Sequence, residues 1–180
     1  MLQIDIVEKC KANDRSAQMQ LYRQYCDGMY CVAMRFLKNA DDAEDVLQEA
    51  FIKAFQKIHQ FKGDVTFGAW LKRIVVNKCI DFLKSKRDNT ITLDETYMRP
   101  VDDTDWTVEE YIDVDEVKVA IEQLSNKYKY VVMMYLVEGF DHGEISEVLK
   151  ISETACRTRL LRGKGQLKEI LKSKGYGTGS

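Results

Sequence analysis

Apolar residues recur every three or four positions along most of this chain, which is the period of amphipathic helices. The alternation of apolar and polar residues that marks strands is scarce, and the 180 residues include a single proline, Pro100. Hydrophobic residues make up 45% and charged residues 31%, which is ordinary for a folded, helix-rich chain. We therefore predict an all-α fold.

The period is interrupted once, so we expect two helical domains joined by a flexible linker. Residues 89–118 hold ten acidic and only two basic residues, and residues 89–112 show no strong periodicity. The predicted domains are residues 1–88 and 114–172, with an acidic linker at 89–113 and a flexible tail at 173–180. Expected helices cover residues 2–11, 14–37, 41–58, 64–87, 114–124, 126–137, 141–149 and 153–172. Asp14, Asp141 and Ser152 are suitable N-caps, and Gly139 suits the left-handed position after a helix.

The helix predicted at 64–87 is apolar almost all round and keeps one narrow polar stripe. At spacings of three and four, these side chains share one face. Cations, an amide and an aromatic ring on a rigid helix suit single-stranded nucleic acid, because phosphates pair with cations and bases stack on rings. The alternative is a solvated face with a half-buried tryptophan. The stripe consists of Trp70, Arg73, Asn77, Asp81 and Lys84.

The last two predicted helices have the helix-turn-helix pattern, in which a short helix and a tight turn precede a second, capped helix. The second helix would lie in the DNA major groove, where arginine bonds guanine and hydroxyls hold phosphates. A helical hairpin with a solvated basic face is the alternative. The candidate DNA-binding residues are Ser152, Glu153, Thr154, Arg157, Thr158, Arg159, Arg162 and Lys164.

Acidic residues gather on one face of the helix predicted at 41–58. Paired carboxylates can serve acid–base chemistry or hold a metal, but this face has no histidine nearby and no glycine-rich phosphate loop. We therefore expect a solvated face or a docking surface for a basic partner, and no enzymatic activity. The face comprises Asp41, Asp42, Asp45, Gln48 and Glu49.

The five cysteines form no CxxC pair, so reduced thiols are expected. Cys26 and Cys31 with His59 are the one metal candidate, and their spacing matches no known ligand set. We predict no metal and no cofactor. No apolar run approaches the roughly 18 residues of a membrane span, and the N-terminus lacks a signal-peptide pattern, so we expect a cytoplasmic protein without membrane insertion.

Two long segments resemble bacterial RNA polymerase sigma factors. DAEDVLQEAFIKAFQKIHQF and TFGAWLKRIVVNKCIDFLKSKR, at residues 42–61 and 66–87, resemble the second conserved region, and most closely that of the small extracytoplasmic-function group. Residues 124–171, beginning LSNKYKYVVMMYLVEGFDHGEISEVLK, resemble the fourth region. The resemblance covers roughly residues 10–88 and 114–172, in the family's order.

The resemblance implies a transcription initiation factor that binds core RNA polymerase and directs it to specific promoters. The acidic face at 41–49 would dock on the coiled coil of the largest polymerase subunit. The last helix would read the −35 element as duplex, and the linker would pass through the polymerase. The resemblance also implies an anti-sigma factor as a further partner. Since polymerase supplies the phosphodiester chemistry, no catalytic residue is needed.

The loop at 61–66 and the helix after it would help to melt the −10 element and hold its non-template strand. A flipped base would rest in a pocket of the loop, with its unstacking offset by stacking and polar contacts. Asn77, Asp81 and Arg87 would lie near the upstream edge of the bubble. The implied −10 residues are Phe61, Lys62, Gly63, Asp64, Thr66, Trp70, Arg73, Asn77, Asp81, Lys84 and Arg87.

Some positions depart from the family pattern. Lys150 stands where the turn usually holds glycine, and Thr154 replaces another usual glycine. Gly163 and Gly165 fall inside the last helix, where each costs about 1 kcal/mol relative to alanine. Two other functions remain open: a helix-turn-helix regulator that never engages polymerase, which leaves the first 88 residues unexplained, and an enzyme acting on nucleic acid.

Overall fold

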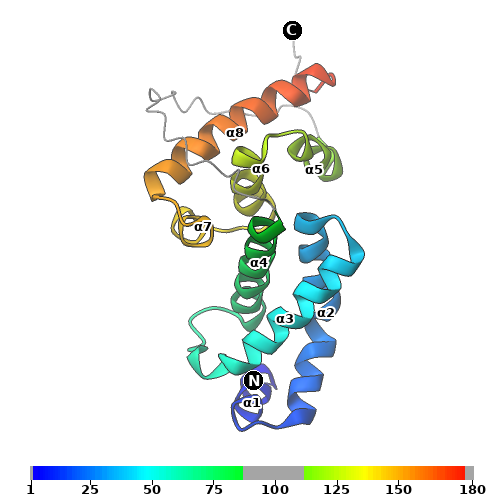
Figure 1. The fold of residues 1–180 in the computed structure, drawn as a ribbon, viewed down its shortest axis with the longest axis vertical. Coiled ribbons are helices and arrows are strands. Elements are labelled where there is room, and N and C mark those ends of the chain that lie inside the picture. Colours follow the sequence, from blue (N-terminus) through cyan, green and yellow to red (C-terminus); the bar gives the residue numbers. More distant parts are fainter. Residues whose placement is uncertain (1, 87–111, 177–180) are drawn as a thin grey trace. The chain divides into compact units, whose positions relative to one another are not determined.

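The structure is a computed structural model that describes residues 2–86 and 112–176. The chain forms two compact units, residues 1–90 and 91–180, and each is described by itself. Every regular element in the described residues is helical, so the predicted all-α class is confirmed (Figure 1). The expectations for Arg87, for most of the linker and for the end of the tail fall outside the described residues.

The first unit contains α1 (Leu2–Lys11), α2 (Arg15–Leu37), α3 (Ala40–Gln56), a 3-10 turn η1 (Ile58–Gln60) and α4 (Phe67–Lys86). Helices α2, α3 and α4 pack on one another around fully buried residues such as Leu21 and Leu71 (Figure 1). The predicted cap is present, because the Asp14 carboxylate accepts hydrogen bonds from two amides of the first turn of α2.

Helix α4 differs from its prediction in two respects. It begins at Phe67 instead of residue 64, because Gly63 turns the chain at φ +82° and the Thr66 hydroxyl accepts a hydrogen bond from the Ala69 amide at 3.2 Å, as an N-cap does. It is also buried on one side and not almost all round. Residues that remain partly exposed despite their apolar character are Ile74, Phe82 and Leu83.

The second unit contains α5 (Val114–Glu122), α6 (Asn126–Val132), a π-helical turn η2 (Met133–Val137), α7 (His142–Leu149) and α8 (Glu153–Ser173). The helix predicted over 126–137 is confirmed, but its second part is π-helical instead of α-helical, since the Glu138 amide donates a hydrogen bond to the Met133 carbonyl five residues back. This wider turn leaves Met133, Met134 and Phe140 all buried. Gly139 then adopts the predicted left-handed conformation at φ +75°.

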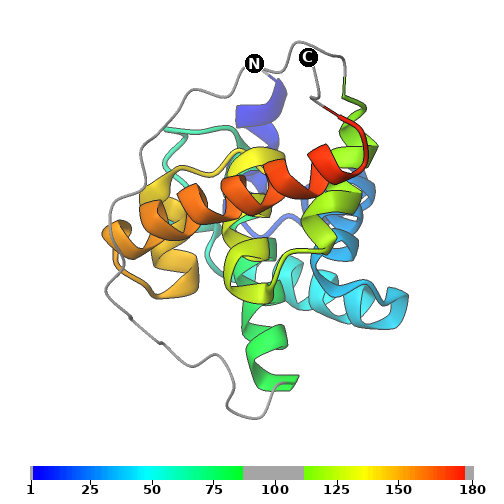
Figure 2. The same ribbon diagram turned by 90° about the horizontal axis from the view of Figure 1, so that it is seen from above.

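Helix α8 runs unbroken across α6, although two glycines lie inside it (Figure 2). Gly163 is buried at this crossing, where a Cβ atom would lie only 2.4 Å from Cγ2 of Val132. The expectation that the glycines weaken α8 therefore misses the role of Gly163, which lets two helices approach closely. Gly165 has nothing within 4 Å of its Cβ position.

The turn between α7 and α8 has the geometry of a helix-turn-helix. Asp141 and Glu144 form a capping box at the start of α7, and Lys150 ends that helix in the left-handed conformation, at φ 55° and ψ 48°. Ser152 caps α8 two residues later. Lys150, which stands where the family usually has glycine, thus does adopt a left-handed backbone.

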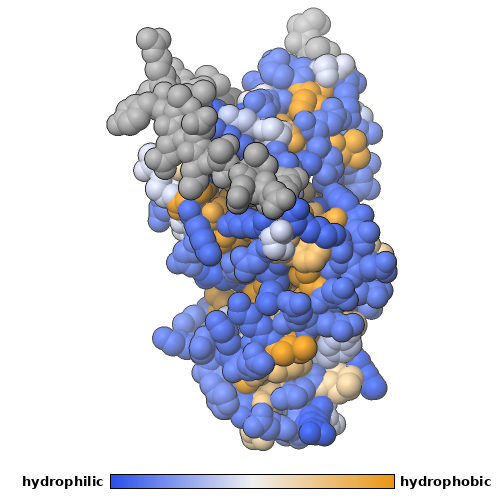
Figure 3. All heavy atoms as spheres, viewed as in Figure 1, coloured by the Kyte–Doolittle hydropathy of each residue, from blue (hydrophilic) through white to orange (hydrophobic). Residues whose placement is uncertain are grey.

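The face of the described residues that Figure 3 shows is mainly polar. In Figure 3 hydrophilic residues dominate the face in view, and the apolar patches between them are small. Among the described helices, none is both long and apolar enough to span a membrane.

Candidate nucleic-acid and partner interfaces

The acidic face of α3, defined as Asp41, Asp42, Asp45, Gln48 and Glu49, is partly neutralised by the neighbouring helix α4. Lys86 Nζ lies 2.7 Å from Asp42 Oδ2, and Lys78 Nζ lies 3.1 Å from Glu49 Oε2. Asp41, Asp45 and Gln48 are exposed. Exposed ion pairs of this kind contribute only about 0–1 kcal/mol, so both carboxylates can exchange a lysine for a partner's cation.

Sequence reasoning missed the role of Lys78 and Lys86. The signal was present in their spacing, because the two lysines are eight residues apart on α4 and their acidic partners are seven apart on α3. Matching spacings about two turns long are what two packed antiparallel helices require. Only the pairing of α3 with α4, which is a tertiary contact, shows that the spacings meet.

A polar groove of about 270 Å³ adjoins the acidic face between α2 and α3, and Gln48 forms part of its wall. The Cys26 thiol in this groove lies 3.5 Å from Asp27 Oδ1. Burial and the Asp27 carboxylate raise the pKa of Cys26, so its thiol stays protonated at neutral pH. The groove therefore offers carboxylates and hydroxyls, which suit a basic side chain, and no reactive nucleophile.

Three rings form an aromatic cluster where the loop after η1 enters α4. Phe61, Phe67 and Trp70 have ring centroids 5.5–5.6 Å apart in each pairing. Phe67 is buried, whereas Phe61 and Trp70 are half-buried and retain exposed surface. The structure thus brings the predicted nucleic-acid residues Phe61 and Trp70 into direct contact and adds Phe67, which the sequence reasoning counted only as part of the helix.

Beside this cluster, the loop forms one wall of a pocket of about 310 Å³, called the loop pocket here. Lys62, Gly63 and Thr66 line it, while Asp64 is exposed on the same loop and does not. The opposite wall comes from α1, through Val7, Glu8 and Lys11. None of these three α1 residues was predicted to belong to a site.

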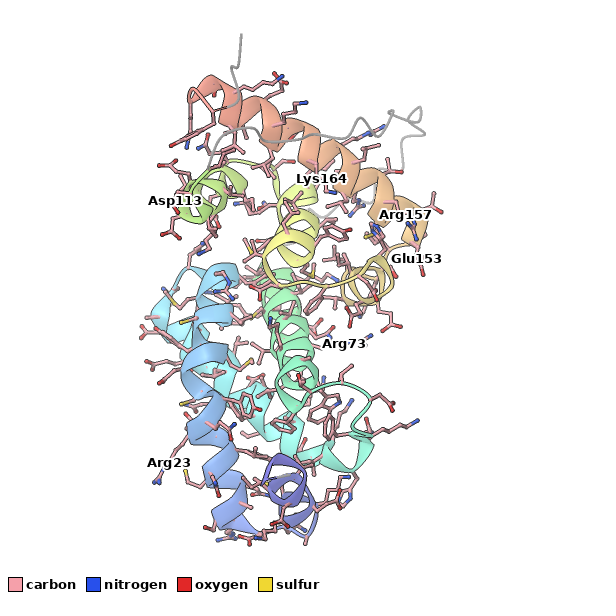
Figure 4. The ribbon with its side chains drawn as sticks, turned by 180° about the vertical axis from the view of Figure 1, so that it is seen from behind. Arg23, Arg73, Asp113, Glu153, Arg157 and Lys164 are labelled. Atoms are coloured by element: carbon pink, nitrogen blue, oxygen red, sulfur yellow. The ribbon has the colours of Figure 1, made fainter. Side chains whose placement is uncertain are left out.

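The predicted stripe on α4 continues from the aromatic cluster. Trp70, Arg73, Asn77 and Lys84 are half-buried and Asp81 is exposed, so the face is neither closed nor fully solvated. The Asn77 side-chain amide donates to the Arg73 carbonyl at 2.9 Å, which leaves its carbonyl oxygen available. Figure 4 places the Arg73 label beside the middle of α4.

The outer face of α8 presents its polar residues in two sets. Near the N-terminus of the helix, Glu153 and Arg157 are exposed and lie 3.6 Å apart, and Figure 4 shows both at this end. The Thr158 hydroxyl donates to the Thr154 carbonyl at 3.0 Å, and Thr154 is exposed. Ser152 accepts the Ala155 amide at 3.1 Å, so its hydroxyl is part of the cap.

Farther along α8, Arg159, Arg162 and Lys164 are half-buried. Lys164 Nζ lies 4.9 Å from the ring centroid of Tyr135, and this ring stacks on His142 at 5.2 Å. Tyr135 belongs to the π-helical turn, so sequence periodicity gave no sign of this contact. The stack holds Lys164 against its own domain.

The cysteines offer no metal centre in the part of the chain that the structure describes. No group of three or more His, Cys, Asp or Glu side chains there is arranged to hold an ion. None of the five cysteines forms a disulfide; Cys10, Cys79 and Cys156 are buried, and Cys31 is exposed. Burial raises the pKa of Cys156, which lies 3.8 Å from His142 Nδ1, and raises that of Cys10 to about 11.

Comparisons with known proteins match both units. Residues 21–89 match the family model described as Sigma-70 region 2, and residues 115–167 match that of Sigma-70, region 4. The extracytoplasmic-function (ECF) RNA polymerase sigma factor SigM of Mycobacterium tuberculosis is 30% identical over 161 residues, which cover 89% of this chain and 80% of that protein.

The ECF RNA polymerase sigma factor SigE of Mycolicibacterium smegmatis is 31% identical over 159 residues, covering 84% of this chain and 60% of that protein. This chain therefore spans less than two thirds of SigE. Among solved structures, the sigma factor RpoE of Bartonella quintana, crystallised with the anti-sigma factor NepR, aligns with a TM-score of 0.56 at 20% identity. That alignment covers 86% of this chain and 96% of RpoE, and it supports the fold.

Proposed function

This chain belongs to the extracytoplasmic-function group of the sigma-70 family, and we propose that it binds bacterial core RNA polymerase and directs it to specific promoters. One observation carries the proposal: both conserved regions of the family match this chain in the family's order, at 21–89 and 115–167. A helix-turn-helix regulator that acts without polymerase would use the second match alone and leave the first without a function.

The acidic face of α3 is the proposed contact with core polymerase. Its exposed residues Asp41, Asp45 and Gln48 can meet a basic helix without first breaking an internal ion pair of the kind that Asp42 and Glu49 make. Charge complementarity of this kind raises the rate of association and selects the partner. The polar groove beside Gln48 extends the surface with hydroxyl and carboxylate groups.

The proposed −10 surface combines the loop pocket, the aromatic cluster and the α4 stripe. Exposed Lys62 and half-buried Arg73 and Lys84 supply cations for the strand's phosphates, while the rings of Phe61 and Trp70 supply stacking surface. Stacking on aromatic rings contributes about 1–3 kcal/mol per base, which is enough to offset the unstacking of a base from the duplex. Melting would thus be driven by capture of the unpaired strand.

The proposed −35 surface is the exposed N-terminal part of α8. Arg157 and Thr154 are exposed on the outer face of the helix, so they are the proposed base-reading residues. Arg159, Arg162 and Lys164 are the proposed phosphate contacts, since positioning needs charge but no fixed donor pattern. Polymerase would perform the phosphodiester chemistry, and we propose no catalytic residue in this chain.

The proposed setting is the bacterial cytoplasm, and the proposed further partner is an anti-sigma factor, by analogy with the RpoE–NepR complex. The decisive experiment mixes the purified chain with core polymerase, preferably that of its own organism, and measures transcripts from a library of promoter fragments. Specific initiation that depends on the chain is the expected result. Binding to promoter DNA without any effect on the cognate polymerase would contradict the proposal and favour a regulator.

Asp45→Asn tests the polymerase contact, because it removes one exposed charge from the acidic face and changes little in volume. We expect affinity for core polymerase to fall about tenfold, as charged contacts at such interfaces typically contribute 1 kcal/mol or more. Asp115→Asn on α5 is the control, since Asp115 is also an exposed carboxylate, lies outside the face and pairs with Lys118 of its own helix at 3.0 Å. Equal affinities for the two variants would remove α3 from the proposed interface.

A further inference from the structure

Helix α1 forms one wall of the loop pocket, whose other lining residues lie at positions 61–67. The region 2 match begins at residue 21, so it does not include α1. Nevertheless Val7, Glu8 and Lys11 line the loop pocket opposite residues 61–67. The pocket of about 310 Å³ is thus closed on one side by a helix that the family comparison leaves without a role.

The two walls of the loop pocket differ in chemistry. The loop wall includes the edge-to-face rings of Phe61 and Phe67, at 5.6 Å. On the α1 wall, Lys11 Nζ lies 2.8 Å from Glu8 Oε1, and the side chains of Lys11 and Glu8 are 24% and 61% exposed. A hydrogen-bond acceptor therefore stands directly beside a donor, opposite an aromatic surface.

This α1 pair is held on a rigid support. Val7 and Cys10 are 3% and 0% exposed, and α1 packs against both α2 and η1. The end of α1 is fixed by the hydrogen bond from the Asp14 amide to the Lys9 carbonyl, at 3.1 Å. The backbone under Glu8 and Lys11 is therefore held in place, so both side chains start from fixed points on the pocket wall, as selective binding requires.

A nucleobase has the complementary chemistry, with a flat face that stacks on rings and an edge on which donors and acceptors alternate. The pocket volume lies at the lower end of the 300–1,000 Å³ typical of small-molecule sites, so it accommodates one ring system and not several. We infer that Glu8 and Lys11 are specificity-determining residues for a single unpaired base that enters the loop pocket. This inference rests on the proposed function, which brings the melted −10 strand to the loop.

The experiment uses the full chain with core polymerase and a promoter selected from the library. Each −10 position of the non-template strand is varied through the four bases and an abasic site, and initiation is measured for each template. The variants are Glu8→Gln and Lys11→Met. Lys9→Met is the matched control, because Lys9 is on the same helix and pairs with Asp5 at 3.6 Å but does not line the pocket.

For the unchanged chain we expect one −10 position at which the amount of initiation depends strongly on the base. There the ratio of initiation between the best and the worst base should be far larger than the loss of the base alone, measured on the abasic template, explains. Glu8→Gln and Lys11→Met should each lower that ratio about tenfold, the usual effect of one base-edge contact, and leave the ratios at other positions unchanged. Lys9→Met should leave every ratio unchanged.

Full base discrimination by both variants, with normal initiation, would overturn the assignment of α1. A loss of initiation that is equal for all four bases and the abasic template would also overturn it, since that is the result of a merely structural role. If the unchanged chain initiates at no promoter with its cognate polymerase, the proposed function fails, and the assignment fails with it.

Discussion

At the scale of single residues, the two glycines of α8 have opposite roles. Ala at 165 meets open space and gains helix propensity, so Gly165→Ala should raise the free energy of unfolding by about 0.5–1 kcal/mol. Ala at 163 would press on the fully buried Val132, and overpacking typically costs 1–3 kcal/mol. Gly163→Ala should therefore destabilise the fold. Urea unfolding of the two variants checks these signs, and two changes of the same sign would contradict the packing argument.

Cys10 should make stability fall at high pH. Burial, with a smaller contribution from Asp14, raises the thiol pKa from 9.0 to about 11 in the folded chain. The thiol of the unfolded chain loses its proton at a lower pH than the thiol of the folded chain. The stability that the protonated thiol contributes is therefore fully present below pH 9 and is lost as the pH rises to about 11. The free energy of unfolding should fall less steeply over this window in Cys10→Ala than in the unchanged chain. Parallel curves would show that Cys10 titrates alike in both states.

At the scale of elements, the start of α8 combines a structural and a proposed DNA-binding role in Ser152. Loss of the hydrogen bond to the Ala155 amide in Ser152→Ala should lower stability by about 1 kcal/mol. Ser152→Asp keeps a capping oxygen, so it should unfold like the unchanged chain while its charge repels the phosphates of −35 DNA. Thermal unfolding and duplex binding, with Ser152→Asn as the uncharged control, separate the roles. Equal DNA binding by the Asp and Asn variants would place Ser152 away from phosphate.

At the scale of the whole molecule, we expect residues 1–88 and 114–176 to fold as separate fragments. Each contains its own buried core, exemplified by Leu71 in the first and Met134 in the second. Circular dichroism of each purified fragment should show a helical spectrum and one cooperative unfolding transition. A fragment without cooperative unfolding would show that its domain depends on the rest of the chain.

The free chain should also bind promoter DNA weakly. Its net charge of −2 gives no overall attraction to phosphate, although residues 157–174 hold seven cations and one carboxylate. The separate fragments 1–88 and 114–176 lack the acidic residues 89–113. The second fragment should therefore bind duplex DNA more strongly at low salt than the intact chain does. Tight, sequence-specific binding by the intact chain without polymerase would contradict this expectation.

The local features of the fold were accessible from the sequence. The three-to-four period placed the helices, and Asp14, Asp141 and Ser152 cap them as predicted because a cap needs only a side chain and the amides two or three residues on. The same locality explains why Gly139 was predicted to be left-handed. The candidate site residues followed from spacing on one helix face, and their assignment to DNA or polymerase stays a prediction.

Only the tertiary structure decided which faces meet. The ion pairs of α3 with α4 depend on helix packing, as does the close approach of Gly163 to Val132, and no local pattern encodes these pairs. The π-helical turn at 133–137 departs from the regular period and buries Met133 and Met134, and no local pattern predicted it. The loop pocket joins residues of α1 and of the loop that are fifty or more positions apart. Local conformation depends on neighbouring residues, so it can be predicted from a single sequence. Contacts between distant segments depend on how the helices pack, and several packing arrangements are compatible with the same local pattern.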